Sequence, residues 1–106
     1  MLLYNFPLKW RNKGIEEPSI YCKEKAETVI FILKSNNIKS ERITPSIEGG
    51  LLIYCFNEKN NRSLDIEIYN DLEVATVISD IKECKIISSE DIEDLNFKSV
   101  LKEFFK

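Results

Sequence analysis

The chain has 106 residues, of which 43% are hydrophobic and 31% are charged, and its formal net charge is −3. This composition is typical of one folded domain rather than a disordered chain, and the acidic balance argues against general affinity for nucleic acid or anionic membrane. The sequence contains no histidine, which excludes Ser-His-Asp and Cys-His catalysis by this chain alone.

Residues 1–17 have an irregular apolar and basic pattern that predicts an N-terminal arm. The apolar part precedes the basic part, the reverse of a signal peptide, and no apolar run is long enough to span a bilayer. The three cysteines are widely spaced and form no CxxC pair, which argues against zinc and for reduced thiols in the core. They are Cys22, Cys55 and Cys84. We therefore expect a cytoplasmic protein with no membrane partner.

The first predicted element is a helix that begins at Pro18-Ser19 and ends at Ser35-Asn36-Asn37. Proline fits the first helical turn, and an asparagine can adopt the left-handed conformation that follows a helix. The apolar residues between them recur at helical spacing. They are Cys22, Ala26, Val29, Ile30 and Leu33.

The middle of the chain predicts an antiparallel meander of strands. Arg42–Ile47 contains a proline, which suits an edge strand or a strand end. Leu51–Phe56 is continuously apolar, so we expect a central strand that is either covered on both faces or carries aromatic side chains on a half-wet face. Ser63–Tyr69 alternates apolar and acidic residues, as half-buried strands do. A tight turn at Asn70-Asp71 then leads into a strand over Leu72–Ser79.

Gly49-Gly50 could belong to a phosphate-binding loop or to a turn. Phosphate-binding loops follow a strand and open a helix, with a lysine or further glycines. Here a strand follows the glycines and no such lysine is present. Glycine adopts positive φ without steric cost, so the pair predicts a turn that leads into the next strand.

The last third predicts a further strand over Lys82–Ile87 and then helical structure. Ser88 and Asp91 have the spacing of a capping box, which predicts a short helical turn. After Asn96, a possible second cap, four apolar residues form a helical stripe. They are Phe97, Val100, Leu101 and Phe104. The predicted fold is a single α+β domain over residues 1–106, a two-layer sandwich in which an N-terminal and a C-terminal helix flank an antiparallel meander of three to five strands.

Asp65 and Glu67 are two residues apart on one predicted strand, so their carboxylates project from the same face. Such a pair can hold Mg²⁺ in nucleases, and Glu48 and Asp80 could join it if the strands align. Those nuclease sites usually add a lysine where this chain has Tyr69. The favoured interpretation is a solvated sheet face, and a metal site is the alternative.

Two charged segments are candidates for binding a partner. Lys9, Trp10, Arg11 and Lys13 could stack on and contact nucleic acid, or the tryptophan could be a hydrophobic anchor between basic residues. The net charge opposes nucleic acid. An acidic patch could dock a basic partner, or its charges could cap a helix. The patch consists of Glu90, Asp91, Glu93 and Asp94.

Several short motifs follow one another in an order that resembles a group of small prokaryotic proteins. They are Trp10, Pro18-Ser19, Ala26, Pro45-Ser46, Gly49-Gly50-Leu51 and Leu64-x-Ile66-Glu67-Ile68. The group shows a tryptophan, a helix, a P-[ST]-x-[DE]-G-G-[IL] turn and an L-x-I-E-I strand. Some members occur among mobile or toxin–antitoxin-like genes, so the resemblance implies a partner-binding role and no catalytic residue. This chain departs from the pattern at Cys55, near where an aromatic is common.

These features together predict a small protein-interaction domain with no enzymatic activity and no cofactor. It would resemble an antitoxin, an immunity protein or an accessory regulator, and would bind another protein or a second copy of itself. One alternative is a metal-dependent, nuclease-like enzyme that uses Asp65 and Glu67. The other is an accessory protein that binds nucleic acid through the basic N-terminal segment.

Overall fold

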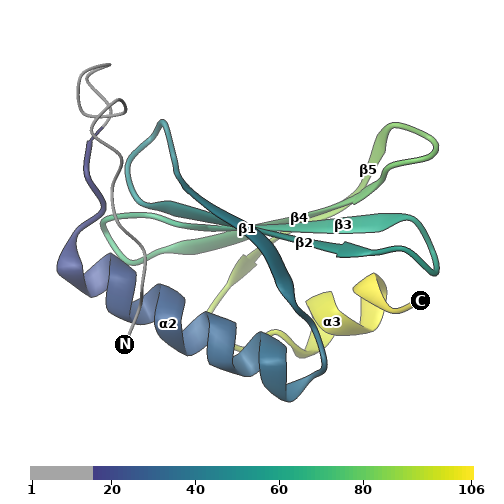
Figure 1. The fold of residues 1–106 in the computed structure, drawn as a ribbon, viewed down its shortest axis with the longest axis horizontal. Helices are drawn as coiled ribbons and strands as arrows, with labels where there is room; N and C mark the ends of the chain where they lie inside the picture. The colour runs from purple at the N-terminus through teal and green to yellow at the C-terminus, as the bar shows by residue number, and fades with distance from the viewer. Residues whose placement is uncertain (1–15) are drawn as a thin grey trace.

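A computed structural model describes residues 16–106 of the chain. Within these residues the chain forms a helix, five strands and a second helix, in that order (Figure 1). The elements are α2 (Ile20–Ser35), β1 (Ser40–Pro45), β2 (Leu51–Asn57), β3 (Arg62–Ile68), β4 (Val74–Asp80), β5 (Lys85–Ile92) and α3 (Lys98–Phe104). The prediction of an α+β fold with an antiparallel sheet is confirmed.

The five strands form one sheet in the order β1-β2-β3-β4-β5, and each neighbouring pair is antiparallel. Short turns join successive strands, and such turns bring sequential strands side by side. Each edge pair is interrupted by an irregularity, between Ser40 and Arg42 in β1 and opposite Ile78 and Ser79 in β5. Irregular edge strands are poor templates for pairing with other chains.

Helix α2 begins and ends at the signals that predict it. The Ser19 hydroxyl accepts a hydrogen bond from the Cys22 backbone N–H at 3.1 Å, and Asn37 has a φ of 60° just after the helix. The Ser19 N–H also donates to the Asn70 side-chain oxygen at 2.8 Å, which ties the start of the helix to the β3–β4 turn.

The glycine pair forms the turn between β1 and β2, as predicted. Gly49 and Gly50 have φ values of 90° and 107°, a conformation that side chains rarely allow. A Cβ on Gly50 would lie 2.0 Å from the Ile68 carbonyl oxygen, so β3 passes directly against this turn.

The helical turn predicted at Ser88–Asp91 is wrong, because these residues belong to β5. Ser88 pairs with Ile78 and Asp91 pairs with Ala75. The backbone N–H and C=O groups of this segment therefore find their hydrogen-bond partners in β4 and not within a helical turn. The predicted cap at Asn96 lies just ahead of α3, where its side-chain oxygen accepts from the Lys98 N–H at 3.1 Å.

The strand predicted from Leu72 begins instead at Val74, and Leu72 lies in the turn with a φ of 72°. The turn closes through a 2.9 Å hydrogen bond from the Tyr69 N–H to the Glu73 carbonyl. Asp71 adds a side-chain bond, accepting from the Glu73 N–H at 3.0 Å. Leu72 is therefore exposed and contributes no side chain to the sheet's inner face.

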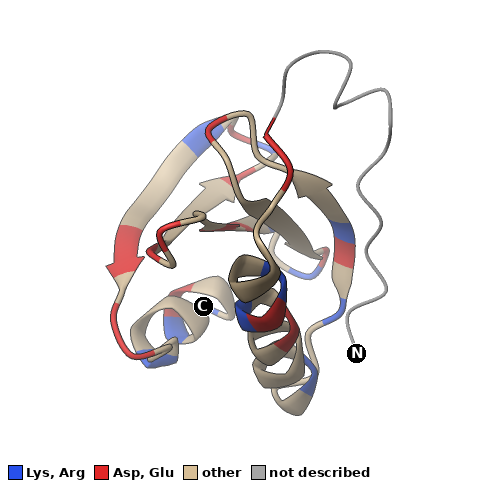
Figure 2. Ribbon diagram, turned by 90° about the vertical axis from the view of Figure 1, so that its left-hand side faces the viewer, with Lys and Arg blue, Asp and Glu red and all other residues tan. Residues whose placement is uncertain are grey.

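The core lies between the two helices and one face of the sheet. Both helices lie on the same side of the sheet in Figures 1 and 2, and buried residues of both belong to one cluster with the strands. The strand members of this cluster are Leu51, Ile53, Cys55, Leu64, Ile66, Ile68, Val74, Ile78 and Ile92. Cys22 and Cys55 are buried as predicted, but Cys84 is exposed because it lies in the β4–β5 turn with a φ of 55°.

Within residues 16–106, neither helix has the length and apolar character that crossing a bilayer requires.

Candidate functional site

The face of the sheet opposite the helices is the candidate site, and we call it the open face. Within residues 16–106, no helix or strand lies over it (Figure 1). Side chains alternate between the two faces of a strand, so the residues between the core positions all project here. The open face consists of Arg42, Thr44, Leu52, Tyr54, Phe56, Ser63, Asp65, Glu67, Ala75, Val77, Ser79, Ser89 and Asp91.

The strand register arranges ten of these side chains in two rows across all five strands, and Phe56, Ser63 and Ser79 belong to a third row. One row runs Arg42, Tyr54, Asp65, Val77, Ser89, and the next runs Thr44, Leu52, Glu67, Ala75, Asp91. Directly opposed side chains on neighbouring strands lie close enough to interact. Each of the two five-strand rows therefore sets one carboxylate of β3 between an apolar or aromatic residue of β2 and an aliphatic residue of β4.

Glu67 forms hydrogen bonds within the chain. Its carboxylate accepts hydrogen bonds from the hydroxyls of Ser46 and Tyr69, the latter at 3.0 Å. The Ser46 hydroxyl in turn accepts from the Glu48 backbone N–H at 3.2 Å. These bonds attach the β1–β2 turn to β3, so Glu67 has a structural role at this end of the sheet.

The same surroundings change the acidity of Tyr69. Burial first, and then the hydrogen bond to Glu67, raise the pKa of Tyr69 to about 12. The negative charges of Glu67, Glu48 and Asp91 act in the same direction, because they disfavour a phenolate. Tyr69 therefore stays protonated at neutral pH and acts as a donor.

Asp65 differs from Glu67, because none of the hydrogen bonds among residues 16–106 involves its carboxylate. Burial raises the pKa of Asp65, the positive charge of Arg42 lowers it, and the charge of Glu67 raises it further. The Arg42 guanidinium lies 5.0 Å from the centre of the Tyr54 ring, a cation–π distance. A half-buried carboxylate thus stands beside an aromatic ring and one cation in the middle of the open face.

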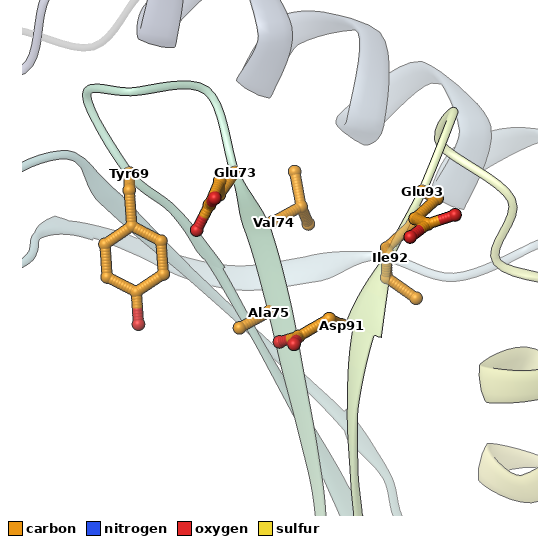
Figure 3. Close-up of a pocket in the computed structure, with 7 residues that line it drawn as sticks. All are labelled: Tyr69, Glu73, Val74, Ala75, Asp91, Ile92 and Glu93. Atoms are coloured by element: carbon orange, nitrogen blue, oxygen red, sulfur yellow. The ribbon is translucent and has the colours of Figure 1, made fainter.

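One rim of the open face contains a pocket of about 210 Å³ (Figure 3). Its lining residues are Tyr69, Glu73, Val74, Ala75, Asp91, Ile92 and Glu93. Figure 3 shows Val74 pointing toward α2, away from the Asp91 carboxylate. The polar side chains of this pocket are one phenol and three carboxylates, so its field favours cationic groups.

The pair predicted as a metal site does share one face, but the further carboxylates do not complete it. Asp80 lies at the opposite end of β4 from the residue that pairs with Glu67, and its side chain accepts from the Glu83 N–H at 2.9 Å. No group of three or more histidine, cysteine, aspartate or glutamate residues in the described range is placed to hold a metal ion. Tyr69, at the position of the nuclease lysine, hydrogen-bonds to Glu67 instead.

The predicted acidic patch is divided by the strand that contains it. Glu90 and Asp91 are successive residues of β5, so they project to opposite faces. Asp91 and Glu93 line the pocket at the rim of the open face, whereas Glu90 lines a separate hollow with residues around α3. Asp94 follows in the turn with a φ of 53°. Figure 2 shows the acidic end of β5 at the edge of the sheet.

The basic candidates Lys9, Trp10 and Arg11 lie outside the described residues. The open-face residues Tyr54 and Val77 were not singled out in the sequence. The sequence around Tyr54 is continuously apolar and contains aromatic residues. This pattern is compatible with a strand covered on both faces and with a strand that has one partly solvated face, so it does not identify Tyr54 as a surface residue.

No family model, curated protein or solved structure matches this chain. The resemblance to small prokaryotic proteins therefore stays a prediction, and the functional argument depends on the geometry of the open face.

Proposed function

We propose that this chain is a small non-enzymatic protein-interaction domain that binds its partner through the open face. The observation that carries the proposal is the half-buried apolar group Leu52, Tyr54, Phe56 and Val77 on a sheet face that no helix or strand of residues 16–106 covers. In this arrangement the fold is a two-layer α+β sandwich, in which the helices bury one face and the other remains for a partner. Exposed apolar surface bordered by charges is characteristic of interaction sites.

The residue types of the open face favour protein recognition. Tyrosine and arginine are enriched where binding energy is concentrated in interfaces, and Tyr54 and Arg42 already lie in contact with each other. The strands hold these side chains in fixed register, so little conformational entropy is lost when a partner binds.

The charges of the open face favour a partner with a basic surface. Asp65, Glu67 and Asp91 lie on it and Arg42 is its one basic residue, while Glu73 and Glu93 border the pocket at the rim. Complementary charge speeds association and selects among partners. Antitoxins, immunity proteins and accessory regulators all act by binding one macromolecule, and we place this chain among them. A second copy of the chain is the alternative partner.

The proposal is tested by comparing two apolar-to-lysine variants as immobilised bait in a lysate of the source cell. Val77→Lys alters the open face, whereas Phe31→Lys alters an exposed position on α2. We expect a protein that the wild-type and Phe31→Lys chains retain and that Val77→Lys loses. The purified protein should then bind the wild-type chain in calorimetry, more weakly as salt increases.

The proposal would be contradicted if Val77→Lys and Phe31→Lys retained the same amount of the bound protein. It would also be contradicted if neither the wild-type chain nor Phe31→Lys retained any protein from the lysate. Circular dichroism of both variants shows whether the sheet is intact. A native mass spectrum of the wild-type chain tests the alternative partner, because self-association through the open face should be lost in Val77→Lys alone.

A further inference from the structure

We propose that the open face fixes the orientation of its partner. Basic side chains of the partner lie at the end of the face that contains Glu67 and Asp91, and apolar side chains lie at the end that contains Phe56. The partner is a protein whose contact segment is basic at one end and apolar along the rest. This inference rests on the proposed function, because it names the chemistry of the protein that the open face binds.

Charge is distributed unevenly along the strands of the open face. The row Thr44, Leu52, Glu67, Ala75, Asp91, which we call the acidic row, contains two carboxylates and no cation. The middle row contains one charge of each sign, from Arg42 and Asp65. The third row, which begins at Phe56, contains no charged residue. The open face is therefore acidic at one end only.

The uncharged end of the open face carries exposed apolar surface. Ile86 of β5 pairs with Ser79, so it continues the third row, and its side chain is 68% exposed. Phe56 is the β2 member of the same row and is half-buried. Residues 80–85 beside this end include two lysines and two acidic residues, so they add no net charge. Apolar contact is therefore the main interaction that this end offers to a partner.

The acidic end contains the pocket of Figure 3, whose chemistry suits a basic side chain. Its lining includes the carboxylates of Glu73, Asp91 and Glu93, and none of the described residues that line it is a lysine or arginine. Tyr69 donates its hydroxyl proton to Glu67 at 3.0 Å, so the phenol oxygen has only lone pairs left for a ligand. A ligand of this pocket must therefore donate hydrogen bonds, and lysine and arginine side chains are donors without acceptors.

The size of the pocket limits it to one such group. Its volume is about 210 Å³. That volume equals roughly seven water molecules at about 30 Å³ each. We therefore expect one lysine or arginine side chain of the partner to enter it.

Distance keeps the two ends of the open face chemically separate. The acidic row and the third row are four residues apart along β2, β3 and β4. Four residues span about 13 Å, which exceeds the Debye length of about 8 Å in physiological salt. The field of the acidic row is therefore weak at the third row.

This separation penalises the reverse orientation of the partner. A reversed partner would place its basic groups over the uncharged row and its apolar side chains over Glu67 and Asp91. Carboxylates that lose water without gaining a donor cost free energy, so the correct orientation is selected by repulsion as well as by attraction.

Two small probes test this division of the open face. They are N-acetyl-arginine methylamide and N-acetyl-phenylalanine methylamide, and backbone amide NMR of the nitrogen-15-labelled full chain locates each. We expect the arginine probe to shift the amides of Tyr69, Glu73 and Glu93 most. The phenylalanine probe should shift those of Phe56 and Ile86 most. N-acetyl-citrulline methylamide, the uncharged match for arginine, should bind the pocket about threefold more weakly.

Three outcomes of this titration would overturn the proposal. The first is that the arginine and phenylalanine probes shift the same amides, and the second is that neither shifts any. The third is an arginine probe whose shifts spread equally over exposed carboxylates away from the pocket, such as Glu24 and Glu83.

Variants at the two ends give a second measurement. Glu73→Gln combined with Glu93→Gln should weaken the arginine probe about threefold and leave the phenylalanine probe unchanged. Ile86→Ser should weaken only the phenylalanine probe, by about threefold. The controls Glu24→Gln and Phe31→Ser make the same kinds of change at exposed positions of α2 and should affect neither probe. Equal arginine binding by the pocket variant and Glu24→Gln would refute the proposed orientation.

Comparison with the lysate experiment separates this proposal from the proposed function. If Val77→Lys loses a retained protein but the probes do not divide between the two ends, the orientation is refuted and the proposed function stands. If the probes divide as expected but no protein depends on Val77, the proposed function fails and the division of the face remains.

Discussion

At the scale of single residues, Gly50 shows how closely the β1–β2 turn packs on β3. Replacing Gly50 by alanine places a Cβ at a φ of 107° and 2.0 Å from a backbone oxygen that cannot move freely. Backbone strain and overpacking each cost roughly 1–3 kcal/mol, so we expect Gly50→Ala to lose about 3 kcal/mol of unfolding free energy. Urea denaturation followed by circular dichroism measures the loss.

Gly49→Ala is the matched control for this clash. Gly49 also has positive φ, but its nearest neighbours are the ends of the Glu16 and Asn70 side chains at 3.3 and 3.4 Å. We expect a loss of about 1 kcal/mol, the ordinary cost of a side chain at such a backbone conformation. Equal losses in the two variants would show that the contact with β3 does not restrict the turn.

Tyr69 gives the folded state a dependence on alkaline pH. Its pKa is about 12 in the folded chain and near 10.0 in the unfolded chain, so between these values the folded state holds the proton longer. Stability is therefore fully present below pH 10 and falls as the pH rises toward 12. We expect urea midpoints to fall more steeply over this window for the wild type than for Tyr69→Phe. Parallel curves for the two proteins would contradict the raised pKa.

The sequence alone was enough to assign these residues to a strand face or a turn, but it did not predict the hydrogen bonds between them. Alternation was enough to put Asp65 and Glu67 on one face, and adjacent glycines were enough to predict a turn. Tyr69 bonds to Glu67 from two positions away, but the bond from Ser46 depends on a turn about twenty positions away folding back over β3. No local pattern encodes that contact, so the difference between a bonded Glu67 and an unbonded Asp65 emerged only from the three-dimensional arrangement.

At the scale of elements, the start of α2 depends on Ser19. Its hydroxyl accepts from the Cys22 N–H at 3.1 Å, which satisfies a backbone donor that the helix leaves unpaired. We expect Ser19→Ala to lower the free energy of unfolding by about 1 kcal/mol, as measured by urea denaturation. The control is Ser35→Ala at the other end of the helix, where the hydroxyl bonds only to the Phe31 carbonyl in exposed surroundings. A loss as large in Ser35→Ala would argue against a capping role.

Elements with several agreeing signals were predictable, whereas β5 was not. Helix α2 has a cap, an apolar stripe and a terminating asparagine, and all three indicate the same bounds. In Ser88–Asp91 a serine precedes acidic residues, which suits a helix start and an exposed edge strand equally well. Pairing with β4 decides between them, and this is a tertiary interaction that the local sequence does not contain. Leu72 differs for another reason, because a local turn closed by hydrogen bonds within residues 69–73, and not the apolar pattern, sets its conformation.

At the scale of the whole molecule, α3 completes the core and fastens to the far end of the sheet. The Asn60 side chain donates to the Phe104 carbonyl at 2.8 Å, and the Arg62 guanidinium donates to the Glu103 carbonyl. The Phe104 side chain is 1% exposed, whereas that of Phe105 is 51% exposed. The two adjacent phenylalanines therefore form a natural comparison of buried and exposed contributions.

We expect Phe104→Ala to cost about 3–5 kcal/mol, because it removes a buried aromatic side chain and leaves a cavity. Phe105→Ala should cost about 1 kcal/mol, because its half-exposed ring keeps only a tilted contact with the Phe104 ring at 5.4 Å between centroids. Thermal and urea denaturation of the two variants measure the difference. Similar losses of unfolding free energy in the two variants would mean that α3 does not unfold cooperatively with the sheet.

The chain order of the strands has a consequence for synthesis on the ribosome. Each strand pairs with the one made just before it, so hairpins can form one after another as the polypeptide emerges. Phe97, Val100 and Phe104 are synthesised after all five strands. Until they are available, the apolar side chains of β3 and β4 that they cover remain exposed to solvent. Ribosome-bound chains stalled before residue 97 should therefore be protease-sensitive and attractive to chaperones, and the final helical turns convert them into a resistant product.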